Sequence, residues 1–301
     1  MGTPEPLLYP GLMTELIPNP FRRGEISVRD GRHLTYAEFG SPNGTPAILV
    51  PGAASGSLMA FGGTALVARG IRLISFDRPG LGKSDVDPEK TLHSVGADIA
   101  ELVSVLAGHA VPVIANSQGA PFGIAAALCG AATRLILASP SDEVALPEVT
   151  EQLPSEFQQL VRAVDRASIP EADEMFRSFT ATTFFDMVMN HPSPGDSAVY
   201  GDHEFRKRFR LAVQEGFAQG PLGYARDTSL AMSRWGLDLQ GVEVPVHVLF
   251  GAQDSSHSPD HGKILASRFV GASRKVIPDV GGSLLWARPE IVLDLCGGDP
   301  R

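Results

Sequence analysis

A serine at position 117 stands where the sequence changes from strand-like to helix-like. Residues 111–115 are mostly apolar, Asn116 and Ser117 follow, and a small-residue run extends from 119 to 128. This order predicts a strand, a sharp turn and a helix, the setting in which a strained turn exposes a nucleophilic hydroxyl. Its alternative is an ordinary turn with a helix-capping serine. We favour the first interpretation, in which Ser117 attacks a carbonyl carbon and forms an acyl-enzyme.

Apolar runs on both sides of Ser117 predict the elements that would hold it. Continuous apolar runs are typical of parallel strands that are buried on both faces. Residues 47–50 are such a run, and further strands are predicted at 71–76, 111–115, 134–138, 244–250 and 274–277. Predicted helices alternate with these strands, which implies a parallel sheet wrapped by helices with right-handed crossovers. Before them, residues 25–28 and 33–39 alternate in polarity around Asp30-Gly31 and predict an antiparallel hairpin.

The strand pattern disappears between residues 139 and 237. This segment is polar and helical in pattern, with large apolar residues interspersed. We interpret it as a helical lid or cap, inserted into an α/β core made of residues 24–138 and 238–301. Most of its large apolar residues are expected to pack within the insertion, and a few to face the site. Prolines at 4, 6, 10, 18 and 20 predict an extended arm over residues 1–23.

The composition limits the partners of the chain. Its 301 residues carry a formal net charge of −9, which argues against nucleic acid or an anionic membrane surface as partner. Two cysteines far apart predict neither a disulfide framework nor a zinc site. With no signal peptide or membrane-spanning run in the sequence, we expect a cytoplasmic protein. No metal or organic cofactor is expected, the partner is a small apolar substrate or ligand, and a homodimer is compatible with the sequence.

Four landmarks carry a family resemblance, and together their order and spacing are specific. They are Pro51-Gly52-Ala53, the segment 77–84 (Asp-Arg-Pro-Gly-Leu-Gly-Lys-Ser), the turn at Ser117, and Gly251-Ala252-Gln253-Asp254. Past residue 24 the chain resembles the α/β-hydrolase fold family, in its serine hydrolase or esterase-like branch with a helical lid. It departs from the family pattern in having Ala115 for a glycine and Pro51 for a histidine. Asp77 is interpreted as structural, bracing the glycine-rich turn that follows it.

The resemblance implies roles for individual residues. Ser117 would be the nucleophile, and the backbone N–H groups of Ala53 and Gln118 would form the oxyanion hole. Asp254 would be the triad acid. The alternative acid is Asp142, for which we favour a helix N-cap.

The family histidine is expected just ahead of the final helix, where this chain has Gly281-Gly282-Ser283. The eight histidines lie at 33, 93, 109, 191, 203, 247, 257 and 261, all upstream of that turn. His257 and His261 lie in the Asp254 loop, which we interpret as the wrong place for a base between Asp254 and Ser117. His191 and His203, in the insertion, are the alternatives. Ser283 cannot act as base itself, so the sequence predicts a compromised triad.

Three functions remain open at this point. The first is hydrolysis of an apolar carboxylic ester or lactone through Ser117, modified by the serine at position 283. The second is non-hydrolytic chemistry, such as cyclisation or isomerisation, in which the oxyanion hole stabilises an enolate or alkoxide. The third is non-catalytic binding of a hydrophobic ligand. On the first hypothesis, Ser283→His is expected to raise ester hydrolysis by orders of magnitude.

Overall fold

An eight-stranded sheet forms the centre of the computed structural model, which describes residues 15–190 and 192–297. The strand order is β1-β2-β4-β3-β5-β6-β7-β8. β2 is antiparallel to β1 and to β4, and every later pairing is parallel. The strands are β1 (Arg22–Ser27), β2 (His33–Gly40), β3 (Thr45–Val50), β4 (Ile71–Phe76), β5 (Val111–Ser117), β6 (Ala132–Pro140), β7 (Val246–Gly251) and β8 (Ser273–Ile277).

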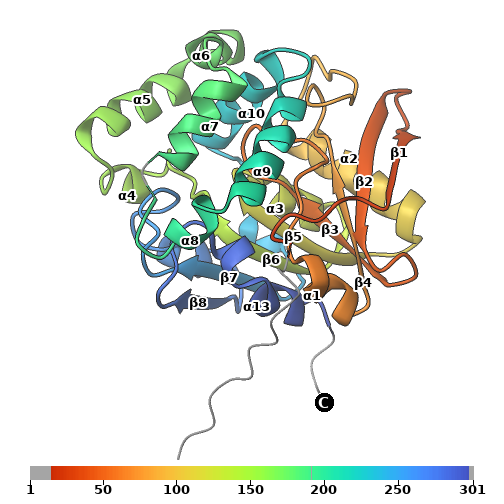
Figure 1. Cartoon of the computed structure of the whole chain (residues 1–301). Helices are drawn as coiled ribbons and strands as arrows, with labels where there is room; N and C mark the ends of the chain where they lie inside the picture. Colours follow the sequence, from red (N-terminus) through yellow and green to blue (C-terminus); the bar gives the residue numbers. More distant parts are fainter. Residues whose placement is uncertain (1–14, 191, 298–301) are drawn as a thin grey trace, which may run out of the picture.

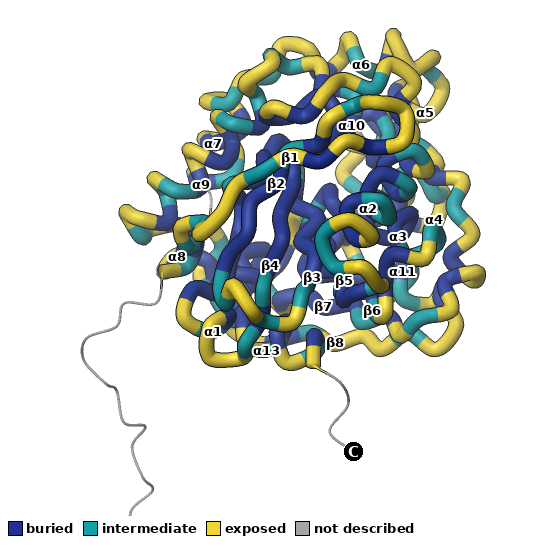
Figure 2. Tube along the Cα trace, turned by 90° about the vertical axis from the view of Figure 1, so that its right-hand side faces the viewer, coloured by how far each residue is buried: buried dark blue, intermediate teal, exposed yellow. Residues whose placement is uncertain are grey.

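The buried strands have apolar side chains on both faces, so the sheet carries two cores. Successive side chains of β3 alternate between them, with Ala47 and Leu49 in one core and Ile48 and Val50 in the other. Figure 2 shows the central strands buried and the exposed residues confined to the periphery. The predicted strands and the predicted N-terminal hairpin are confirmed, and β8 differs from the central strands in being mostly exposed.

Helices cover both faces of the sheet. α2 (Leu92–Ala107), α3 (Ala120–Leu128) and α11 (Lys263–Ser267) share one core, and α1 (Gly63–Ala68), α12 (Leu284–Ala287) and α13 (Pro289–Asp294) share the other. The segment between β3 and α1, residues 53–62, is a loop.

Between β6 and β7 in the sequence lie seven α-helices. They lie together above the sheet and are coloured green to cyan in Figure 1. They are α4 (Pro147–Thr150), α5 (Ser155–Arg166), α6 (Ile169–Phe176), α7 (Ala181–Met189), α8 (Ser197–Tyr200), α9 (His203–Gly216) and α10 (Leu222–Met232). Except for His191, residues 141–237 are fully described and contain no strand; β6 extends to Pro140, two residues into the segment expected to lack strands. We call residues 141–237 the helical insertion; its function as a lid, and the domain boundaries given above, stay predictions.

The predicted arm falls mostly outside the described residues, which begin at Glu15. Its last two residues, Arg22 and Arg23, already belong to β1. The described residues contain no helix long and apolar enough to cross a membrane.

Asp77 braces the turn after β4, as predicted. Its buried carboxylate accepts hydrogen bonds from the N–H groups of Ser57 and Lys83 and from the hydroxyl of Thr35. These three donors come from separate segments, so one side chain joins β2, the loop after β3 and the glycine-rich turn. A carboxylate suits this position because it only accepts hydrogen bonds.

Replacing Asp77 by asparagine tests this brace. The amide would turn a donor toward a donor, so we expect Asp77→Asn to lower the free energy of unfolding by about 2–4 kcal/mol. Asp85 is the matched control from the same turn, because its side chain is 52% exposed. Asp85→Asn is expected to change stability by less than about 1 kcal/mol in urea unfolding. Equal effects of the two substitutions would contradict the assignment.

Candidate active site

Ser117 lies at the strained turn between β5 and α3. Its φ of 51° lies in the left-handed region, which non-glycine residues rarely adopt. The close approach of strand and helix leaves no room for larger neighbours. A Cβ on Gly123 would stand 2.5 Å from the Cβ of Ala115, and a Cβ on Gly52 would stand 3.2 Å from that of Ser117. The geometry is that of the predicted elbow rather than of a helix cap.

The imidazole of His257 contacts the hydroxyl of Ser117. Its Nε2 lies 3.0 Å from Ser117 Oγ. Its Nδ1 lies 2.9 and 3.0 Å from the two carboxylate oxygens of Asp254. A proton on Nδ1 satisfies the carboxylate and leaves Nε2 free to accept the hydroxyl proton. The structure therefore brings together a hydroxyl, an imidazole and a carboxylate in the order that nucleophile activation requires.

The expectation that His257 lies in the wrong place was wrong, and so was the prediction of a missing base. Asp254 follows β7, and the chain turns back within three residues, so that the imidazole returns over its own acid. The Asp254 carboxylate also accepts hydrogen bonds from the N–H and hydroxyl of Ser256. The spacing of three residues between an acid and a histidine was the sequence signal that could have predicted this contact.

Ser283 occupies the position of the family histidine without joining this array. It is fully buried, and its hydroxyl has no hydrogen-bond partner among the described residues. Its N–H donates to Asp196 of the helical insertion, as do the N–H groups of Gly281 and Gly282. Ser283, predicted at the catalytic histidine position, is therefore not a candidate catalytic residue, because an imidazole from another loop already contacts Ser117.

The turn at 281–283 instead shapes the space around His257. A Cβ on Gly282 would stand 3.0 Å from Cε1 of the His257 ring. A side chain at position 282 would therefore push the imidazole aside by a few tenths of an ångström. Asp196 was not predicted from the sequence. Its carboxylate accepts the three backbone hydrogen bonds from this turn and so joins the turn to the helical insertion.

Asp142 supports the His257 loop rather than capping a helix. The next helix, α4, begins at Pro147, so the predicted N-cap is wrong. The Asp142 carboxylate accepts a hydrogen bond from the hydroxyl of Ser258, and its N–H donates to the carbonyl of His257. Burial raises the pKa of Asp142 to about 6. No hydrogen bond joins its carboxylate to the His257 ring, so Asp254 is the acid that contacts the imidazole.

Charge and burial oppose one another at the imidazole. Burial lowers the pKa of His257, but the adjacent Asp254 carboxylate and its hydrogen bond more than offset this and raise the pKa above its ordinary value. Asp196 adds a smaller attraction of the same sign. For Asp254, burial raises the pKa, but His257 outweighs burial and holds that pKa well below its usual range. The carboxylate therefore stays ionised at neutral pH.

Two backbone N–H groups beside Ser117 have no acceptor in the described part of the chain. They belong to Ala53 and Gln118, the two predicted oxyanion-hole donors.

The two histidines predicted as alternative bases lie in the helical insertion. His203 is 90% exposed at the start of α9, and His191 lies outside the described residues. No group of three potential metal ligands occurs among the described residues.

Comparison with known proteins identifies the family. The model of the alpha/beta hydrolase family matches residues 47–295. The chain belongs to this family. This chain is 26% identical over 285 residues to "Uncharacterized hydrolase YcgS" of Bacillus subtilis strain 168. The aligned residues cover 89% of this chain and 94% of the relative. The family and this relative support a hydrolase-type function.

Solved structures share the fold at lower identity. A hydrolase from Pseudomonas aeruginosa PA01 is 23% identical with a TM-score of 0.64, over 93% of this chain and all of the other. A thermophilic esterase from Thermogutta terrifontis is 24% identical with a TM-score of 0.58, over 91% of this chain and 96% of the other. These likenesses establish the α/β-hydrolase fold.

The raised pKa of His257 can be measured directly. We expect nuclear magnetic resonance titration of the His257 ring to give a midpoint above that of an ordinary histidine, because the charged form gains the Asp254 carboxylate. Asp254→Asn removes that charge and leaves burial, which favours the neutral ring. The midpoint should then fall below that of the unaltered protein. A titration unaffected by Asp254→Asn would contradict the contact.

Proposed function

We propose that this α/β-hydrolase cleaves an apolar carboxylic ester or lactone through an acyl-enzyme on Ser117. The observation that carries the proposal is the contact of His257 with both Ser117 and Asp254. An imidazole at this distance can take the proton of the serine hydroxyl as the bond to the carbonyl carbon forms. Serine without such a base is a poor nucleophile at neutral pH.

The proposed reaction has two stages, formation of the acyl-enzyme and its hydrolysis. Ser117 Oγ attacks the carbonyl carbon while its proton passes to His257 Nε2, and the tetrahedral oxyanion is stabilised by the N–H groups of Ala53 and Gln118. His257 then gives its proton to the leaving alcohol, and the acyl-enzyme forms. Water attacks this ester with His257 again as base, which releases the acid and restores Ser117. Asp254 keeps the imidazole oriented and stabilises its charged form throughout.

Aromatic side chains of the helical insertion support an apolar substrate. Phe179, Phe184 and Phe217 surround Tyr224, with ring centroids 5.2–5.8 Å from the tyrosine ring. Tyr224 lies one turn before Thr228 on α10, and Thr228 accepts a hydrogen bond from the Gln118 side chain. This aromatic cluster therefore lies one helical turn from a residue that contacts the elbow, where it favours an apolar acyl or alcohol group.

The two other hypotheses lose the observation that favoured them. Cyclisation or isomerisation, and non-catalytic binding, became attractive because the sequence predicted no base. With His257 against Ser117, hydrolysis needs no group beyond those of the chain. The non-catalytic binder nevertheless gives a distinct result in the experiment below.

Hydrolysis of p-nitrophenyl esters with acyl chains of increasing length tests the proposal. We expect Ser117→Ala to abolish turnover and His257→Gln to lower kcat by roughly 10⁴- to 10⁶-fold, because the nucleophile loses its base. His203→Gln is the control, because this exposed histidine lies on α9, away from Ser117. It should leave kcat unchanged.

Different outcomes would contradict different parts of the proposal. Turnover that survives His257→Gln would show that the imidazole is not the base. A protein that hydrolyses no ester but binds a lipophilic probe, and does so equally after Ser117→Ala, would favour the non-catalytic binder.

A further inference from the structure

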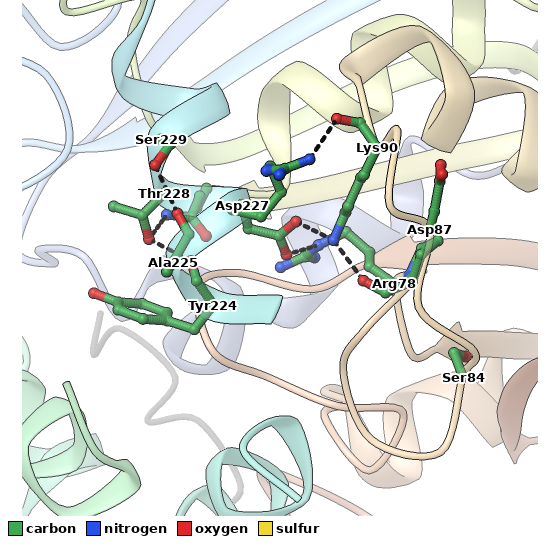
Figure 3. Close-up of polar contacts among 12 residues, drawn as sticks. Arg78, Ser84, Asp87, Lys90, Tyr224, Ala225, Asp227, Thr228 and Ser229 are labelled. Atoms are coloured by element: carbon green, nitrogen blue, oxygen red, sulfur yellow. Dashed lines mark hydrogen bonds and ion pairs between the residues drawn. The ribbon is translucent and has the colours of Figure 1, made fainter. Parts of the chain in front are cut away.

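Three ionisable side chains are buried together behind the loop that carries Ala53. Arg78 and Asp227 are fully buried, and Lys90 is 2% exposed. Arg78 follows β4, Lys90 precedes α2, and Asp227 belongs to α10 (Figure 3). Two cations share one carboxylate, and removing such charges from water costs more than their pairing commonly returns. Stability is therefore a poor explanation of the cluster, and its contacts suggest another.

Arg78 binds the loop after β3 through both of its terminal nitrogens. Nη1 donates to the carbonyl of Pro51 at 2.5 Å, and Nη2 donates to the carbonyl of Gly52 at 3.0 Å. Nε donates to Asp227 at 2.8 Å. The planar guanidinium is thus held on one side by a carboxylate and holds two successive carbonyl groups with the other.

The second of these carbonyls belongs to the same peptide unit as the N–H of Ala53. The described residues contain no cis peptide bond, and in a planar trans peptide the C=O and the N–H point in opposite directions. When Arg78 holds the Gly52 oxygen, it therefore also sets the direction of the Ala53 N–H. No other hydrogen bond in the described part of the chain holds that oxygen.

Gln118, which carries the second proposed oxyanion donor, is anchored to α10 through its side chain. Its partner there is Thr228, the residue that follows Asp227. The side chain of Gln118 donates to Thr228 Oγ1 at 3.1 Å, and Thr228 donates to the Tyr224 carbonyl one turn earlier. Asp227 and Thr228 are consecutive in α10. One helix of the insertion therefore contacts the supports of both donors.

We propose that Arg78, held by Asp227, is a positioning residue that aims the Ala53 N–H at the oxyanion, while Thr228 of the same helix positions Gln118. This inference rests on the hydrolase function proposed above. It gives the helical insertion a second task besides covering the substrate, because α10 is built into the supports of the oxyanion hole. A fixed donor stabilises the transition state more than a mobile one, since it requires no reorganisation during the reaction.

The kinetic test compares Arg78→Lys with Lys90→Met. A lysine is a point charge that cannot bind both carbonyls and Asp227. We expect Arg78→Lys to lower kcat by about 100- to 1000-fold, the effect of losing one oxyanion donor, with KM changed less than about threefold. Lys90 contacts Asp227 and the Pro79 carbonyl but not the loop at 51–53, so Lys90→Met should retain kcat.

The pH profile of kcat distinguishes a loss of the oxyanion donor from a disturbance of the imidazole. The midpoint set by His257 should be the same in Arg78→Lys as in the unaltered protein, because the cluster does not contact the imidazole. Equal kcat in Arg78→Lys and the unaltered protein would overturn the proposal. So would equal losses in Arg78→Lys and Lys90→Met.

Hydrogen exchange separates a failure of this inference from a failure of the proposed function. We expect the amides of residues 52–58 to exchange at least about tenfold faster in Arg78→Lys than in the unaltered protein, and at an unchanged rate in Lys90→Met. This result needs no substrate. Unchanged exchange would overturn the assignment to Arg78, whereas absence of ester hydrolysis in the unaltered protein would overturn the function.

A second pair of variants applies if Arg78→Lys does not fold, as judged by circular dichroism. Thr228→Val removes the partner of Gln118, and Ser229→Ala, its neighbour, removes only a bond to the Ala225 carbonyl within α10. We expect Thr228→Val to lower kcat by about tenfold and Ser229→Ala to leave it unchanged. Equal kcat in these two variants would overturn the role of α10.

Discussion

The contact between His257 and the Asp254 carboxylate is the interaction on which the site depends. The carboxylate lies in a buried position where a charge is costly, and the imidazole directly beside it compensates that cost. The same contact orients the ring so that its other nitrogen meets Ser117. Because Asp254 and His257 are three residues apart, one short loop after β7 supplies both side chains, and the turn after β8 only has to make room for them.

The surrounding structure supplies that room and keeps the loop in place. Gly282 lies under the His257 ring, and Asp196 fixes the turn that contains it. Asp142 holds the loop from the end of β6. The site is thus bounded by the carboxyl ends of β5, β6 and β7, with the helical insertion joined to it through Asp196 and through α10. Chemistry at Ser117 and the packing of the insertion are therefore connected.

Much of this arrangement could be predicted from the sequence, and the rest depended on one loop. The apolar runs predicted the buried strands, and the small residues around Ser117 predicted its strained turn, because both are local consequences of side-chain size and polarity. The position of His257 was not predictable in that way. The path of residues 254–257 is determined by contacts with residues distant in sequence, such as Asp142 and Gly282. The family position of the histidine therefore led to the wrong expectation, as did the helix cap assigned to Asp142.

The most direct test of the account is the effect of Ser283→His on kcat/KM for an activated ester. Ser283 is fully buried, and the preceding residue, Gly282, lies close to the imidazole that already contacts Ser117. The account predicts that the unaltered protein hydrolyses the ester and that this substitution leaves kcat/KM equal or lower. A rise of about 100-fold or more would show that the base belongs at position 283 and would contradict the assignment of His257.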